Sequence, residues 1–287
     1  MIRAVSVRNA EQLRVVLAAG NCPERIYLPY PVFLGQDREL AAAAGLAGRT
    51  HIFANLPYLF RQEPGMPAEE DMENLLGDTV VPMDGLLAHN LEEASFIRDK
   101  GYRGILETDF QIPVWNAEAA GVFAGLFEEA HWEWTVSSEF SLYEIRELLG
   151  ALREKKKADP AAAGIVIYGR VPMMVSANCV RKTAGRCTGR CGEFAGFSYT
   201  LRDRKGRMLP VTGDCRVCYN VILNAVPTSL HRYPDEIRDL GLGRVRIDLT
   251  TETAEETAEI LRVFAGNADT KGPAAETTAG RFKKGVE

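Results

Sequence analysis

Eight short runs rich in apolar and β-branched residues recur along this chain, and a longer amphipathic stretch follows most of them. This alternation is expected when each strand packs beneath the helix that follows it. Eight such units within 287 residues predict an α/β fold, a parallel (β/α)8 TIM-like barrel. The predicted strands are residues 3–7, 25–30, 50–57, 85–90, 104–110, 133–140, 164–170 and 244–250.

The predicted helices begin after Asn, Asp or Ser and end near Gly, as capped helices do. In residues 91–100 the apolar stripe includes Leu91 and Ile97, and the charged residues, Glu93 among them, are predicted to face water. The third unit is the exception, because its prolines predict a loop with at most a short helical piece.

We expect one barrel domain over residues 1–266 and a mobile or peripherally packed tail over 267–287. The connection between the seventh and eighth strands is much longer than one helix requires, so residues 171–240 are predicted to be an insertion. Within it, "FSYTL" and "MLPV" flank a polar turn and predict a β-hairpin. An insertion that follows a barrel strand lies on the face where catalytic loops gather.

Five of the six cysteines lie in this insertion: Cys179, Cys187, Cys191, Cys215 and Cys218. Clustered thiols in a reducing compartment bind metal more often than they form lasting disulfides. Folding the hairpin back can bring the last two cysteines near the first three. Four thiolates suit a tetrahedral zinc or an iron–sulfur cluster, and the ligand set alone does not distinguish them. The sixth, Cys22, is predicted to be a small buried hydrophobic residue.

Polar residues lie at the C-terminal ends of the predicted strands or just after them and are expected on the active face, although each could instead cap the next helix. The net charge of −5 argues against a protein that coats nucleic acid, so any RNA contact must be local. Arginines crowd the insertion, where they would attract a phosphate or carboxylate, or stabilise an anionic cluster. The candidate substrate-binding residues are Asn55, His89, Glu107, Arg170, Arg181, Arg186 and Arg190.

Several function classes find no support in the sequence. It contains neither an HExxH nor a GxSxG motif, so a peptidase would have to use one of the clustered cysteines as its nucleophile. The N-terminus lacks the apolar core of a signal peptide, and no segment approaches the ~20 apolar residues that cross a bilayer. We therefore expect a cytoplasmic protein without a membrane segment.

Four segments, "IYGRVPMMVSANCVRKTAGRC", "LRDRKGRMLPV", "DCRVCYNVILNAVPTSL" and "RIDLTTE", resemble peptidase family U32, the collagenase-like proteins. The likeness extends over most of the chain. It is greatest to the C-terminal region of the long members, among them the hydroxylases that make 5-hydroxycytidine in large-subunit ribosomal RNA.

The resemblance implies oxygen-independent hydroxylation of an RNA base or a similar planar substrate, with a four-iron, four-sulfur cluster held by four cysteines. Carried over to this sequence, the ligands are Cys179, Cys187, Cys191 and Cys215, with Cys218 as the alternative fourth ligand. Two alternatives stay open: a collagenase-like peptidase, and a non-catalytic partner subunit with a structural metal such as zinc. The implied partners are RNA or a small planar molecule, and a second family subunit or the N-terminal half of the long members.

Overall fold

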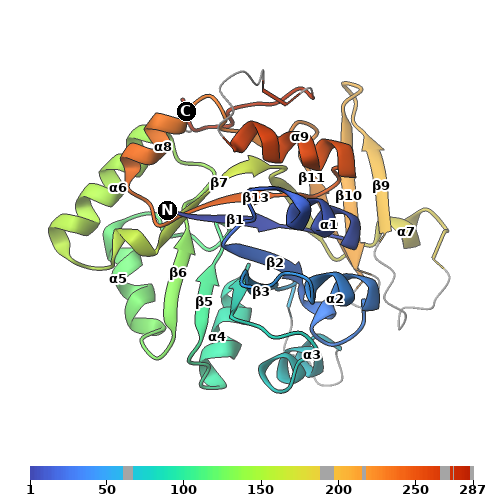
Figure 1. The fold of residues 1–287 in the computed structure, drawn as a ribbon, viewed down its shortest axis with the longest axis horizontal. Helices are drawn as coiled ribbons and strands as arrows, with labels where there is room; N and C mark the ends of the chain where they lie inside the picture. Colours follow the sequence, from blue (N-terminus) through green and yellow to red (C-terminus); the bar gives the residue numbers. More distant parts are fainter. Residues whose placement is uncertain (61–66, 188–196, 215–217, 266–271, 274, 285–287) are drawn as a thin grey trace.

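The computed structural model describes residues 1–60, 67–187, 197–214, 218–265, 272–273 and 275–284. Its centre is a closed barrel of eight parallel strands, and the last of them pairs with the first (Figure 1). The eight predicted strands and the (β/α)8 fold are thereby confirmed. In barrel order the strands are β1 (Ile2–Ser6), β2 (Arg25–Pro29), β3 (His51–Asn55), β4 (Gly85–Ala88), β5 (Ile105–Thr108), β6 (His131–Thr135), β7 (Ala163–Gly169) and β13 (Arg244–Asp248).

Helices surround the barrel (Figure 1), and their apolar faces pack on the outer sides of the strands. Six of them begin at the side chain of Asn9, Asp37, Asn90, Asn116, Ser141 or Thr253, which accepts the backbone N–H three residues further on. The helices of the barrel are α1 (Ala10–Ala18), α2 (Arg38–Ala44), α3 (Pro67–Leu76), α4 (Leu91–Asp99), α5 (Ala117–Leu126), α6 (Leu142–Lys155), α8 (Pro234–Leu240) and α9 (Ala254–Phe264); short 3₁₀ turns span Tyr30–Val32 and Pro160–Ala162.

Two expectations about these helices are wrong. The third unit contains a ten-residue helix, α3, because Pro67 is its first residue, where a missing N–H costs nothing. In α4, Glu93 is fully buried and Leu91 is exposed, since the start of the helix turns Glu93 back toward the barrel.

The insertion forms a separate four-stranded antiparallel sheet beside the barrel (Figure 1). Strand β9 (Phe197–Arg202) and strand β10 (Met208–Asp214) make a hairpin, and β11 (Tyr219–Leu223) pairs with β10 and with β8 (Pro172–Ser176). On the barrel side, the buried residues Tyr219, Val221 and Leu223 pack against Tyr58 and Leu59 of the loop after β3. This contact seats the sheet over one side of the barrel mouth.

Two short segments complete the insertion, α7 (Val180–Thr183) and β12 (Thr228–Ser229), which pairs antiparallel with β7. The described part of the C-terminal tail packs on the barrel. Phe282 is buried and its carbonyl accepts the Leu142 N–H, while the Thr278 carbonyl accepts the Ser229 N–H.

Candidate functional site

The interior of the barrel holds a network of buried charges. Strands β2 and β5 are not neighbours in the sheet, so the contacts between their side chains cross the interior. The Glu133 carboxylate lies 2.5 Å from Nη1 of both Arg25 and Arg244. Three guanidinium groups lie within ion-pair distance of the Glu107 carboxylate: those of Arg25 (3.3 Å), Arg244 (2.8 Å) and Arg246 (3.1 Å).

Glu107 was one of the candidate substrate-binding residues, and the structure encloses it completely. Burial by itself raises the pKa of Glu107, but the three arginines and the Tyr27 hydroxyl that donates to it outweigh burial, so its pKa lies below the ordinary value. A carboxylate neutralised in this way is suited to holding strands together across the barrel. Gly164 leaves room for the network, because a side chain there would press on the Arg244 guanidinium.

A second polar layer lies at the C-terminal ends of the strands. The His89 ring places Nδ1 3.0 Å from an Asp109 oxygen and Nε2 2.5 Å from Asn55 Oδ1. Arg246 connects the two layers, since its Nη2 lies 2.6 Å from Asp109 and its Nε 2.7 Å from Asp248. The structure therefore brings Asn55 and His89 together as the sequence suggested, with Asp109 orienting the imidazole ring.

The two carboxylates of this layer differ in their electrostatics. Burial raises the pKa of Asp109, but the Arg246 charge and the His89 hydrogen bond outweigh it, and the pKa lies well below the ordinary value. For Asp248, burial dominates over the Arg246 charge and raises the pKa. Two neighbouring acids whose pKa values are driven apart provide one fixed anion and one group that can carry a proton.

Tyr58 covers this layer from the loop after β3. Its ring stacks on His89 with a centroid separation of 4.2 Å and an interplanar angle of 21°. Burial, and then the nearby Asp109 charge, raise the pKa of Tyr58 above its ordinary value of 10.0, so its hydroxyl stays protonated and can donate a hydrogen bond.

A cavity of about 260 Å³ lies between the barrel mouth and the insertion sheet. The loops after β1, β2 and β3 form one wall, and β10 and β11 form the other. Its lining combines polar and aromatic groups with prolines and aliphatic residues. The polar and aromatic lining residues are Arg8, Tyr30, Asn55, Tyr58, Thr212 and Tyr219.

The cysteine-bearing connections leave the insertion sheet at the same end as this cavity. Ser176 at the end of β8 pairs with Asn220 at the start of β11, and Asp214 at the end of β10 pairs with Tyr219. In an antiparallel sheet this register puts both the β8–β9 and the β10–β11 connections at one end. Cys179 and Cys187 belong to the first connection and Cys218 to the second.

Asn220 fixes the position of Cys179. Its buried amide donates to the carbonyls of Ser176 (3.1 Å) and Asn178 (2.8 Å), and its Oδ1 accepts the Val180 N–H at 2.9 Å. Cys179 precedes α7 and is only 7% exposed, whereas Cys187 is exposed. Because Asn220 follows Cys218 by two residues, these three bonds tie the two cysteine-bearing connections together.

The remaining predicted site residues are placed as follows. Arg170 donates to the carbonyls of Asn224 and Ala225, which ties the end of the insertion sheet to β7. The Arg181 side chain donates to the Arg186 carbonyl at 3.0 Å beyond α7. Arg190, Cys191 and Cys215 lie outside the described residues, and within the described part of the chain no three His, Cys, Asp or Glu side chains form a metal-binding group.

Four residues important to this site were not predicted: Arg8, Tyr58, Arg246 and Asn220. Arg8 and Tyr58 directly follow the first and third predicted strands, so the rule that active residues follow barrel strands would have found them. Arg246 points inward from within a strand, and Asn220 depends on strand pairing. Neither position leaves a sequence signal.

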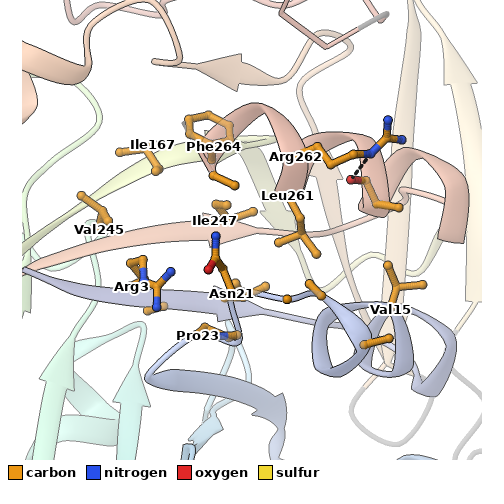
Figure 2. Close-up of a pocket in the computed structure, with 17 residues that line it drawn as sticks. Arg3, Val15, Asn21, Pro23, Ile167, Val245, Ile247, Leu261, Arg262 and Phe264 are labelled. Carbon is orange, nitrogen blue, oxygen red and sulfur yellow. Dashed lines mark hydrogen bonds between the residues drawn. The ribbon is translucent and has the colours of Figure 1, made fainter. Parts of the chain in front are cut away.

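A larger cavity, about 650 Å³, lies on the outer wall between α1 and α9, over β1 and β13 (Figure 2). Its walls are mainly apolar, with Ile247, Leu261 and Phe264 among them. Arg3 at its edge is paired with Glu24. Among the described residues that line it there is no acid, histidine or thiol, so we place the candidate site at the barrel mouth despite the smaller volume.

The chain matches no protein-family model, and a search of curated proteins finds no match. Of the helices that the structure describes, none combines the length and the apolar character needed to span a membrane.

Proposed function

We propose that this protein is an iron–sulfur enzyme, or an enzyme subunit, of oxygen-independent hydroxylation that acts on an RNA base or a similar planar substrate, as the resemblance to family U32 implies. One observation supports this proposal above all. Both cysteine-bearing connections leave the insertion sheet at one end, and Gly213 and Tyr219 at that end line the cavity at the barrel mouth. A redox group bound by these cysteines would adjoin a substrate in the cavity.

The described thiols are compatible with such a group. Cys179 and Cys187 are free thiols, and Asn220 holds the first connection against the second. Cys179, Cys187, Cys191 and Cys215 would hold a four-iron, four-sulfur cluster, with Cys218 as the alternative fourth ligand, and zinc is the alternative metal. The cluster would supply one-electron redox chemistry. The chain's own groups would bind the substrate and hold a proton at Asp248, while Asp109 stays an anion that orients the His89 ring.

Purification without oxygen, followed by iron, sulfide and zinc analysis, tests the metal centre. We expect about four iron and four sulfide per chain in the wild type and in the control Cys22→Ser. Cys179→Ser, Cys187→Ser and Cys191→Ser should lose most of the iron, and comparing Cys215→Ser with Cys218→Ser identifies the fourth ligand. Iron-free protein that binds one zinc would contradict the cluster and favour a structural metal.

The reaction needs its own measurement. RNA from cells that contain the protein and from cells that lack it is digested to nucleosides and compared by mass spectrometry. We expect a nucleoside with the mass of one added oxygen in the first sample, and none when Cys179→Ser replaces the wild type. Equal spectra from all samples would exclude RNA as the substrate and leave a small planar molecule or the partner-subunit alternative.

A peptidase gains less support from the geometry. The hydroxyl of Ser229 lies 2.8 Å from His231 Nδ1, but Ser229 is buried and does not present a nucleophile to a solvent-borne peptide. A gelatin assay that compares the wild type with Cys179→Ala decides this alternative. Cysteine-dependent cleavage above the blank would favour it over the hydroxylase.

A further inference from the structure

We infer that the cavity at the barrel mouth binds a planar ring that carries an anionic group, phosphate or carboxylate, and that Arg8 is the residue that binds the anion. The inference specifies the substrate class of the proposed function and in that sense rests on it. It is nevertheless a statement about binding, so it can be tested on protein without any metal.

Arg8 is an available cation on an anchored backbone. Its side chain is exposed and lines the cavity, and no ion-pair partner for it occurs among the described residues. By contrast, Arg246 is already held by Asp109 and Asp248. The Arg8 backbone is anchored, because its N–H donates to Gln12 Oε1 at 2.8 Å and the Gln12 amide donates to the Glu252 carbonyl at 2.9 Å.

The remaining lining suits a flat ring. Tyr30, Tyr58 and Tyr219 line the cavity together with Pro29 and Pro57, and aromatic and proline rings offer flat apolar surfaces to a planar ligand. Tyr58 is held in place by its stack on His89. The Tyr58 hydroxyl supplies a hydrogen-bonding group at the ring edge, and so does the second amide hydrogen of Asn55, whose nitrogen also donates to Ser6 at 3.3 Å.

The volume limits the size of the ligand. Pockets that enclose drug-sized molecules measure about 300–1,000 Å³, and this cavity, at about 260 Å³, lies below that range. A one-ring group with its anionic substituent fits, while a base pair within a duplex does not. If the substrate is RNA, the target base must therefore be single-stranded or turned out of its stack, with the phosphate next to Arg8.

Two matched pairs of probes test the inference by calorimetric titration: uridine 5′-monophosphate against uridine, and benzoate against benzyl alcohol. We expect the wild type to bind at least one anionic probe more tightly than its neutral counterpart. Arg8→Gln should weaken binding of that anion about 10-fold or more while leaving the neutral probe unchanged. The pair that responds tells whether phosphate or carboxylate is preferred.

Arg14→Gln is the matched control, because Arg14 follows Arg8 closely in the sequence, in α1, but its exposed side chain pairs with Glu39. Equal losses in both variants would show general charge attraction and overturn the inference, as would an absence of binding by all four probes. Each titration is run on iron-loaded and on metal-free protein. Arg8-dependent binding by a protein that never takes up iron would support this inference and reject the cluster. An iron-loaded protein that binds no probe would support the cluster and overturn this inference.

Discussion

At the residue scale, Glu93 shows how a local cap changes the burial that helical periodicity predicts. It was assigned to the water-facing side of α4, yet it is fully buried. Asn90 caps the helix by accepting the Glu93 N–H, and the Glu93 carboxylate returns to accept the His89 N–H at 2.8 Å. Its second oxygen, Oε1, has no hydrogen-bond partner among the described residues. Burial raises the pKa of Glu93 well above the ordinary value of 4.5.

This raised pKa makes Glu93 a source of pH-dependent instability. The unfolded chain releases the Glu93 proton near pH 4.5, whereas the folded protein keeps the proton to a higher pH. The free energy of unfolding therefore falls as the pH rises from 4.5 toward the pKa of Glu93 in the folded protein. Glu93→Gln removes this loss. We expect the variant to gain on the order of 1 kcal/mol over the wild type at pH 8 and little at pH 4, measured by urea unfolding. A difference that does not vary with pH, or one reproduced by Glu92→Gln, would contradict the expectation.

At the element scale, the insertion sheet accounts for how cysteines from distant parts of the sequence approach one another. A hairpin alone can bring the two cysteine groups near each other, but the pairing of β11 with β8 is what puts Asn220 beside Ser176. The three hydrogen bonds of Asn220 then fix the backbone on both sides of Cys179. Losing the buried Asn220 side chain would leave the backbone groups that it bonds unsatisfied. The β8–β9 connection should then open locally while the barrel remains folded.

Thiol labelling of metal-free protein measures this opening. We expect Cys187 to react with iodoacetamide first and Cys179 much later, because Cys187 is exposed and Cys179 is buried. Asn220→Ala should accelerate labelling of Cys179 about 10-fold, with no change at Cys22, which lies between α1 and β2, outside the insertion. Unaltered protection of Cys179 in the variant would show that Asn220 does not hold the connection.

At the scale of the whole molecule, the barrel is closed around charges. Layers of branched apolar side chains usually fill such a barrel, whereas here Glu107 and Glu133 meet Arg25, Arg244 and Arg246 across the interior. Removing one partner from a buried ionic network leaves uncompensated charge on the others. The strands that supply these groups lie on opposite sides of the barrel, so the network couples them directly.

Glu107→Gln should therefore destabilise the protein by roughly 3–5 kcal/mol in chemical denaturation at neutral pH. Because the pKa of Glu107 is lowered in the folded protein, its contribution to stability is present above about pH 4.5. That contribution is lost as the pH falls through the lowered pKa. Arg238→Gln, which breaks an exposed pair with Asp235, should change stability by less than about 1 kcal/mol. Similar losses of stability in both variants would mean that the interior charges contribute no more to stability than the surface charges do.

The sequence by itself determined the elements and their order. The eight strands and most of the helices could be predicted because burial period and capping are local properties, visible in residues such as Asn116 and Ser141. The same rules predicted Asn55 and His89 at the mouth, since each lies near the C-terminal end of a predicted strand. The cysteines were identified as a group from their spacing alone.

Only the tertiary structure decided which side chains meet. Barrel closure brings β13 against β1 and turns Arg244 and Arg246 inward, and a strand pattern does not reveal which of its two faces will be enclosed. The register of β11 on β8 decided that Asn220 holds Cys179, and the seating of the sheet on Tyr58 created the cavity that Arg8 lines. These are contacts between residues far apart in the chain, and their free energies depend on distances that exist only after the barrel has closed.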